Sequence, residues 1–151
     1  MNNIFNSPTE VSMRLLMILS MTNKGKDIDT LTAIDFMATY SKDFEINDYN
    51  LHGDHNYNFS GFTSRRAFIK NALSLLLKNH YIKAIDSKYG IEYVIIEQQK
   101  KVCEKLNSTY ARKYKETVKE VLSKLKNKSS KNIIDELNDY ITSRRKEKKY
   151  E

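Results

Sequence analysis

The sequence predicts a mainly helical α+β fold, in which three helices and a β-hairpin precede a helical C-terminal extension. Apolar residues recur at helical spacing in three segments before residue 80. Two runs rich in β-branched and aromatic residues follow, and helical spacing returns after residue 97. Three helices that end in a hairpin make a winged helix. We therefore assign residues 1–97 to a winged-helix domain and residues 98–151 to a basic helical extension packed on it.

The first helix is predicted to begin at residue 7. Ser7 can cap the backbone NH of Glu10, and Pro8 suits the first helical position. One face carries the core stripe Val11, Leu15, Ile18 and Leu19. The other sides of the helix carry three apolar residues that are candidates for a subunit interface: Met13, Leu16 and Met17. We expect either the chain's own C-terminal helices or another subunit to cover them.

The second helix follows a turn in which Gly25 is expected to end the first helix in a left-handed conformation. Its candidate caps are Asp29 and Thr30. Its apolar side consists of Leu31, Ile34, Phe36, Met37 and Tyr40. Residues 45–62 then show no sustained period and are rich in Asn and aromatic residues. Such a long loop either packs as a specific feature or makes a functional contact, and its His52 is a further candidate interface residue.

The third helix begins near Thr63 or Ser64 and is amphipathic. Its apolar side comprises Phe68, Ile69, Ala72, Leu73, Leu76 and Leu77. Its opposite side comprises Arg66, Lys70, Asn71, Ser74 and Lys78. Arg65 projects into the apolar sector, where it must extend its charged end to the surface or meet a partner acid.

The two β-rich runs span residues 81–85 and 91–96, and Gly90 between them suits the positive φ of a hairpin turn. In a winged helix, the third helix is the recognition-type helix and the loop near Lys88 is the wing. After residue 97, apolar residues at helical spacing predict two longer helices separated by a polar break at residues 128–132.

The net charge of +7 is unevenly distributed along the chain. Residues 1–97 hold 10 Lys and Arg against 11 Asp and Glu, whereas residues 98–151 hold 16 against 8. This asymmetry suggests a polyanion or an acidic protein face as partner, and a solvated basic helix explains it equally well. The winged-helix face offers seven candidate contacts with a protein partner or with nucleic acid: Arg65, Arg66, Lys70, Asn71, Lys78, Lys83 and Lys88. Many winged helices bind proteins rather than DNA, so both kinds of partner remain open.

The sequence contains no recognisable catalytic motif. Its four glycines form no phosphate-binding loop, and HExxH, CxxC and G-x-S-x-G are missing, so we expect no enzyme, no cofactor and no small-molecule substrate. The run from His52 to His55 offers metal-ligand atoms, but a polar loop with local hydrogen bonds is its ordinary interpretation, and no metal is expected. The single Cys103 rules out an internal disulfide and favours a cytoplasmic protein. No stretch has the composition of a signal peptide or a membrane anchor.

Three collinear blocks of the sequence resemble a known family. Residues 5–19, beginning Phe-Asn-Ser-Pro-Thr-Glu, resemble the opening of the middle component of bacterial ABC-three-component systems, the group that includes Lamassu-type anti-phage defence. Residues 51–53, 64–77 and 81–82 resemble that family's Leu-His-Pro loop, Arg-Arg helix and hairpin start. Residues 106–111, Leu-Asn-Ser-Thr-Tyr-Ala, resemble its Leu-x-Ser-Pro-Tyr-Ala turn. Gly53 and Thr109 stand where that pattern has prolines.

The resemblance implies a non-catalytic bridging subunit. Such a subunit joins a coiled-coil ABC ATPase, similar to structural-maintenance-of-chromosomes (SMC) proteins, to an effector nuclease of the same operon. DNA would be contacted through the complex, and no membrane is involved. On this resemblance Arg65 and Arg66 match the paired arginines, and His52 matches the Leu-His-Pro element. The alternative is a stand-alone winged-helix transcriptional regulator, which the same fold and the basic tail also support.

Overall fold

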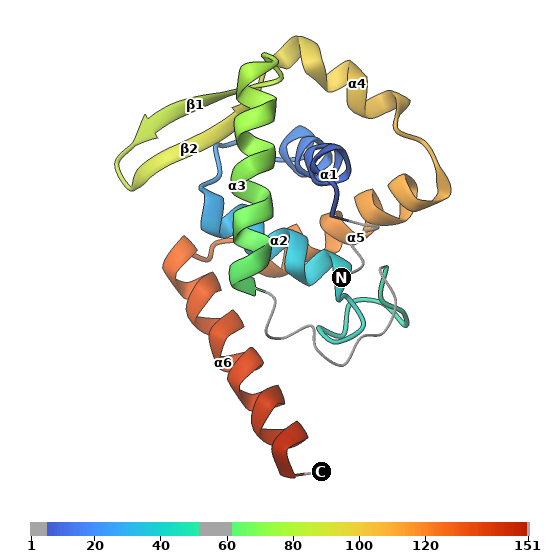
Figure 1. Cartoon of the computed structure of the whole chain (residues 1–151), viewed down its shortest axis with the longest axis vertical. Helices are drawn as coiled ribbons and strands as arrows, with labels where there is room; N and C mark the ends of the chain where they lie inside the picture. The colour runs from blue at the N-terminus through green and yellow to red at the C-terminus, as the bar shows by residue number, and fades with distance from the viewer. Residues whose placement is uncertain (1–5, 52–61, 151) are drawn as a thin grey trace.

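The computed structural model describes the backbone of residues 6–51 and 62–150, and side chains as far as residue 143. The described part is mainly helical and contains a two-stranded antiparallel sheet, as the sequence predicts (Figure 1). Its elements in chain order are α1 (Pro8–Ser20), α2 (Ile28–Thr39), α3 (Phe62–Lys78), β1 (Ile82–Ser87), β2 (Gly90–Ile95), the 3₁₀ turn η2 (Glu97–Gln99), α4 (Lys100–Lys105), α5 (Thr109–Leu125) and α6 (Ser130–Tyr150).

Helix α1 begins as its sequence predicts. The backbone NH of Glu10 donates to Ser7 Oγ at 3.2 Å, and Pro8 occupies the first turn. The helix ends earlier than Gly25, with Met21 as its C-cap in a right-handed conformation. The prediction that Gly25 ends this helix in a left-handed conformation is therefore wrong.

Gly25 has a different structural role, because it lets the α1–α2 loop pass close to β2. A Cβ at Gly25 would lie 2.9 Å from Glu92 Cβ, so any other residue would collide with the strand. The adjacent residue, Lys26, forms an isolated antiparallel bridge with Tyr93, with N–O distances of 3.1 and 2.8 Å. The loop thus lies along the free edge of β2.

Helix α2 lies in the middle of the molecule (Figure 1) and contacts α1, α3, α5 and α6. Every residue from Thr30 to Thr39 is buried, so this helix has almost no solvent face. Its N-cap is Asp27, whose carboxylate accepts from the NH of Thr30 at 2.9 Å. The predicted caps Asp29 and Thr30 are therefore wrong, since both lie inside the helix.

The hairpin pairs Ile82 with Ile95 at its base and Ser87 with Gly90 at its tip. Gly90 has a φ of 118°, as expected for a hairpin turn. The connection is shorter than predicted, because Ser87 and Gly90 are already paired and only Lys88 and Tyr89 join the strands. The hairpin projects from the body with its tip away from α3 (Figure 1).

The C-terminal helices complete the core instead of forming a separate one. α4 and α5 contact α1, and α5 and α6 contact α2. One continuous cluster of buried apolar residues runs from Val11 in α1 to Ile141 in α6. Beyond Ile141, α6 extends away from the rest of the molecule (Figure 1).

The segment that follows α2 packs against this core as far as residue 51. Phe44, Ile46 and Leu51 are partly buried against the core cluster. The side-chain amide of Asn47 donates to Thr117 Oγ1 of α5 at 2.9 Å. The remainder of the predicted loop, including His52 and His55, lies outside the described residues.

Candidate functional site

Six of the seven candidate contacts with a protein partner or nucleic acid are exposed. Arg66, Lys70, Asn71 and Lys78 lie along the outer side of α3, while Lys83 and Lys88 lie on the hairpin. Arg66 is engaged, since its Nε donates to Asp29 Oδ1 at 2.7 Å. Lys88 is at the hairpin tip, five residues beyond Lys83 and therefore about 17 Å from it along the strand. The structure thus groups the α3 residues and separates Lys88 from them.

Arg65 does not belong to that surface, because its exposed fraction is only 6%. Its Nη1 donates to Asp35 Oδ2 at 2.6 Å, and its guanidinium lies over the rings of Phe36 and Tyr40, 5.6 and 5.2 Å from their centroids. Of the two alternatives for Arg65, the structure shows the one in which it meets a partner acid. Its side chain is therefore buried, unlike those of the other six candidate contacts.

Asp35 is the common acceptor of a buried polar cluster that joins four helices. Arg14 of α1 donates to both carboxylate oxygens, at 2.8 Å from Nε and 3.1 Å from Nη2. Tyr114 of α5 donates its hydroxyl to Oδ1 at 2.5 Å, and Arg65 of α3 binds Oδ2. Asp35 has no exposed surface and Arg14 has 2%. The cluster fixes the relative positions of α1, α2, α3 and α5.

The two arginines determine the charge state of the cluster. Burial opposes ionisation of Asp35, but the charges of Arg14 and Arg65 outweigh it and hold the pKa of Asp35 well below its usual range. Burial also works against the charged form of Arg14, yet Asp35 keeps the pKa of Arg14 above its ordinary value. Burial, assisted by Asp35, raises the pKa of Tyr114 well above its usual range. All these groups therefore keep one protonation state near neutral pH.

The candidate interface residues of α1 have different environments. Leu16 and Met17 are buried, with exposed fractions of 4% and 2%, because α4 and α5 pack on this helix. Both are core residues here, so the chain's own C-terminal helices are the covering that the structure shows for them. Met13 remains 41% exposed, beside a groove of about 300 Å³ that Leu106 and Tyr110 also line. His52, the fourth candidate, lies outside the described residues.

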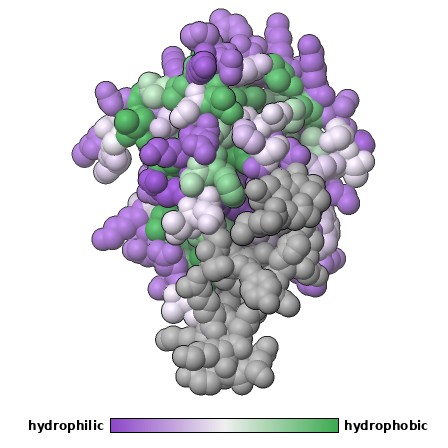
Figure 2. Space-filling model, in the orientation of Figure 1, coloured by the Kyte–Doolittle hydropathy of each residue, from purple (hydrophilic) through white to green (hydrophobic). Residues whose placement is uncertain are grey.

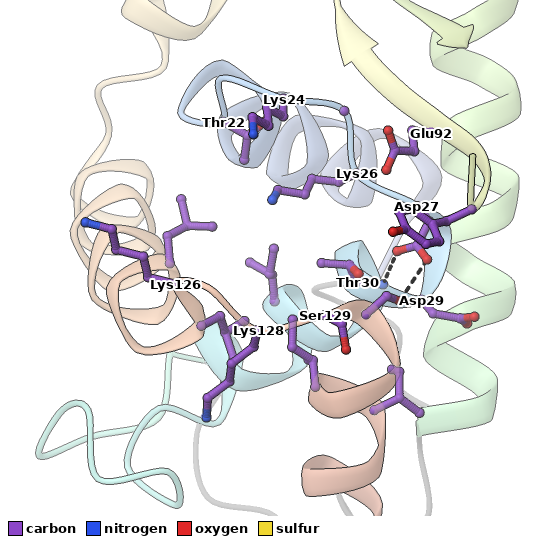
Figure 3. A pocket seen from close by; sticks show the side chains of 18 of the residues that line it. Thr22, Lys24, Lys26, Asp27, Asp29, Thr30, Glu92, Lys126, Lys128 and Ser129 are labelled. Atoms are coloured by element: carbon purple, nitrogen blue, oxygen red, sulfur yellow. Dashed lines mark hydrogen bonds between the residues drawn. The ribbon is translucent and has the colours of Figure 1, made fainter. Parts of the chain in front are cut away.

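A larger cleft of about 990 Å³ lies between the α1–α2 loop, the hairpin tip and the α5–α6 junction (Figure 3). Lys24 and Lys26 extend from the α1–α2 loop, and Lys126 and Lys128 from the opposite wall (Figure 3). Its rim includes Tyr89, which is 84% exposed. No signal in the sequence pointed to this cleft, because its walls come from segments that are distant in the chain, residues 21–34 and 122–135.

Apolar side chains are also exposed near the hairpin. Figure 2 shows hydrophobic atoms among hydrophilic ones in the upper half of the face seen in Figure 1, where the hairpin and the upper part of α3 lie. Ile91, Leu75 and Ile85 are 53, 40 and 38% exposed.

The described residues offer neither a metal site nor a reactive thiol. Among residues 6–51 and 62–143, no group of three His, Cys, Asp or Glu side chains is placed to hold a metal ion. Burial raises the pKa of Cys103, whose Sγ lies 3.4 Å from the carbonyl oxygen of Leu16, so the thiol is a weak nucleophile. No helix in the described part is long and apolar enough to cross a bilayer.

Sequence reasoning missed Asp35, Arg14 and Tyr114 as members of one polar cluster. A signal for it does exist, because Arg14 and Arg65 both fall in apolar sectors of their helices and each needs a buried acid. Asp35 is the acid that lies in the middle of an otherwise apolar and small-residue helix, which is where such a partner would be sought. Tyr114 carries no comparable signal, since its ring also fits the core stripe of α5.

Comparison with known proteins identifies the family of this chain. No curated protein and no solved structure matches the chain. A family model described as ABC-three component (ABC-3C) system Middle Component 2 matches residues 4–147. This match covers nearly the whole chain, from before α1 to the last turns of α6. The protein therefore belongs to the Middle Component 2 family of ABC-three-component systems and is one component of a multi-component assembly.

Proposed function

We propose that this protein is a non-catalytic bridging subunit of a cytoplasmic anti-phage defence complex of the Lamassu type. It would join an SMC-like coiled-coil ABC ATPase to an effector nuclease of the same operon. The observation that carries the proposal is the match of residues 4–147 to a middle component, since the family's description makes it one component of a three-component ABC system. DNA would reach the protein through the assembled complex.

The order and pairing of the elements support a winged-helix fold for this subunit. α1, α2 and α3 precede the β1–β2 hairpin, and the loop between α1 and α2 pairs with β2 through Lys26 and Tyr93. A short strand between the first two helices, a third helix and a terminal hairpin make up the winged-helix arrangement. In this fold α3 is the recognition-type helix and the tip at Lys88 and Tyr89 is the wing.

The enclosed state of the ionisable cluster supports a non-catalytic role. Asp35 has no exposed surface, and its two oxygens accept from Arg14, Arg65 and Tyr114. A carboxylate in this setting cannot reach a substrate, and its low pKa makes it a poor general base. The cluster holds the helices together, and partners bind to the outer surfaces.

The alternative function is a stand-alone winged-helix transcriptional regulator. The exposed row Arg66, Lys70 and Asn71 on α3 favours it, because such side chains can reach base edges and phosphates in a major groove. Two observations weigh against it. Arg65 is withdrawn into the core, and Arg66 is already paired with Asp29.

The decisive experiment is co-purification. The tagged full chain is expressed together with its neighbouring genes, and the product is analysed by sizing and mass spectrometry. We expect a coiled-coil ATPase and an effector subunit to be recovered with it. Recovery of the chain alone, or as a homodimer that shifts one DNA fragment, would overturn the proposal in favour of the regulator.

Binding of DNA by the isolated chain separates the two functions further. A regulator requires tight, sequence-selective binding, and Arg66→Ala would relax specificity at one base position by about 1–3 kcal/mol. A bridging subunit requires no such selectivity. Sequence-independent binding that weakens steeply with salt would instead reflect the charge of the tail.

A further inference from the structure

We infer that the cleft between the α1–α2 loop and the α5–α6 junction binds an acidic, amphipathic segment of a partner component. The inference rests on the proposed function, because it assigns one surface of the bridging subunit to one kind of partner. Three features of the cleft carry it: uncommitted lysines on both walls, an apolar floor between them, and walls held in place by hydrogen bonds.

The lysines supply the charge. Lys24 and Lys26 on one wall and Lys126 and Lys131 on the other form no ion pair within the described part of the chain, whereas Lys128 is paired with Glu136 at 2.7 Å. Figure 3 shows Lys24 and Lys26 on one side of the opening and Lys126 on the other. These cations are free to meet carboxylates brought by a partner.

The acids that line the cleft are largely engaged. Asp27 accepts from Thr30 and Ser130, and Asp29 is paired with Arg66. Asp27, Glu92 and Asp135 are the three lining acids that form no ion pair among the described residues. The carboxylate of Asp27 is occupied by its two hydrogen bonds, so it is less available to the lysines. Four unpaired lysines against three unpaired acids leave the cleft with a small excess of positive charge.

The floor decides between a protein and a nucleic acid. Met21, Leu122 and Ile134 are half-buried between the lysine walls, above the buried side chains of Ile34 and Ile133. A phosphodiester backbone gains nothing from an apolar floor. A protein segment with apolar side chains on one side and carboxylates on the other satisfies both the floor and the walls.

The walls are held in position before any partner arrives. The backbone of Lys26 is bonded to Tyr93 on β2, which fixes the α1–α2 loop. Ser130 Oγ donates to Asp27 Oδ2 at 2.8 Å and ties the start of α6 to the start of α2 (Figure 3 shows Asp27 on its wall). A preformed cleft loses little conformational entropy when it is filled, which favours specific binding.

The test uses the full chain within the assembled complex. We would compare Lys24→Glu/Lys126→Glu with the matched control Lys101→Glu/Lys105→Glu, which changes the net charge equally on α4, outside the cleft. All four lysines are exposed, so both variants are expected to fold. The readout is the dissociation constant for the purified ATPase and effector components, together with a photo-cross-linking residue in place of Tyr89 at the rim.

The cleft variant should weaken association with one component about tenfold or more, whereas the control stays within about twofold. The cross-link should fall in a segment of that component in which Asp or Glu alternates with apolar residues. If the complex assembles but the cleft variant behaves as the control, or the cross-link falls in a basic segment, the inference is overturned and the proposed function stands. If no component associates with the chain at all, both fail.

A second titration separates a nucleic-acid site from a protein site. A fluorescent 30-bp duplex is added to the full chain and to the cleft variant at fixed salt, and anisotropy is measured. We expect equal binding by the two proteins. Loss of duplex binding by the cleft variant, with component association unchanged, would assign the cleft to DNA and overturn the inference.

Discussion

Arg65 on α3 and Asp35 on α2 form an ion pair, 2.6 Å between Nη1 and Oδ2, at a point where the carboxylate has no exposed surface. The pair belongs to a cluster in which two arginines share one acid, so the described cluster carries a net positive charge inside the core. Replacing the acid and replacing one arginine should therefore lower the free energy of unfolding by different amounts.

Asp35→Asn should lower the free energy of unfolding by about 3–5 kcal/mol, because it removes the charged acceptor that two buried guanidinium groups share. The matched control is Asp29→Asn in the same helix, whose ion pair with Arg66 is more than 40% exposed on both sides and should contribute less than about 1 kcal/mol. Urea unfolding followed by circular dichroism measures both. Equal losses for the two variants would contradict the central role of Asp35.

Arg65→Met should destabilise the protein less than Asp35→Asn does. The methionine keeps an unbranched apolar chain near Phe36 and Tyr40, and Asp35 retains its bonds to Arg14 and Tyr114. The same unfolding measurement ranks the two variants. If Arg65→Met proves the more damaging, the excess of positive charge in the cluster is not what limits its stability.

Tyr114→Phe removes a hydroxyl that donates to the Asp35 carboxylate while keeping the aromatic ring in the core of α5. The loss of a hydrogen bond to a charged acceptor should lower the free energy of unfolding by about 1.5–3 kcal/mol. Tyr89→Phe is the control, since Tyr89 is 84% exposed at the hairpin tip and should leave stability unchanged. If Tyr114→Phe and the natural protein unfold at the same urea concentration, the Tyr114 hydroxyl contributes nothing to stability.

Acid pH should remove the contribution of Asp35 to the free energy of unfolding. Although burial opposes its ionisation, Arg14 and Arg65 hold the pKa of Asp35 in the folded protein well below the value of about 3.9 expected in the unfolded chain. The stabilisation is therefore complete above about pH 4 and is lost as the pH falls from there toward the folded-state pKa. The difference in unfolding free energy between the natural protein and Asp35→Asn should narrow below pH 4. A constant difference down to pH 2.5 would rule this out.

Truncation after Glu97 should yield an aggregating fragment. The fragment loses α4 and α5, which cover α1, together with the Tyr114 donor, so Leu16 and Met17 become exposed beside Met13. Sizing by gel filtration, compared with the full chain at equal concentration, measures the effect. A soluble monomeric fragment would show that residues 1–97 fold by themselves, as a division into two domains requires.

The start of α1, the amphipathic α3 and the hairpin could be predicted from sequence because each depends on local signals. Ser7 and Pro8 mark a helix start, and Gly90 marks a turn with positive φ. The pairing of Arg65 with an acid could be predicted from its angular position on α3, which places it among apolar residues. In each case the residues that determine the feature lie within a few positions of one another.

Asp35 could not be assigned by the same reasoning, because helical periodicity assumes that a helix has a solvent face. α2 has almost none, since four other helices surround it. Periodicity alone predicts that a charged residue in such a helix is exposed, unless the helices that surround it are known. The cleft is a similar case, because the packing of α5 and α6 on α2 is what brings Lys26 and Lys126 to the same cleft.

The bonds that tie the core together join residues far apart in the chain. Tyr114 follows Asp35 by 79 residues, and Ser130 follows Asp27 by 103. Contacts of such long range must repay the entropy of closing large loops, so folding should be slower than in helical bundles built from neighbouring segments. During synthesis, α2 emerges with its apolar surface and Asp35 in place long before α5 exists. The apolar surface of α2 is therefore uncovered for a long part of synthesis. The yield of folded protein in the cell should depend on whether this surface is protected from aggregation, for example by chaperones.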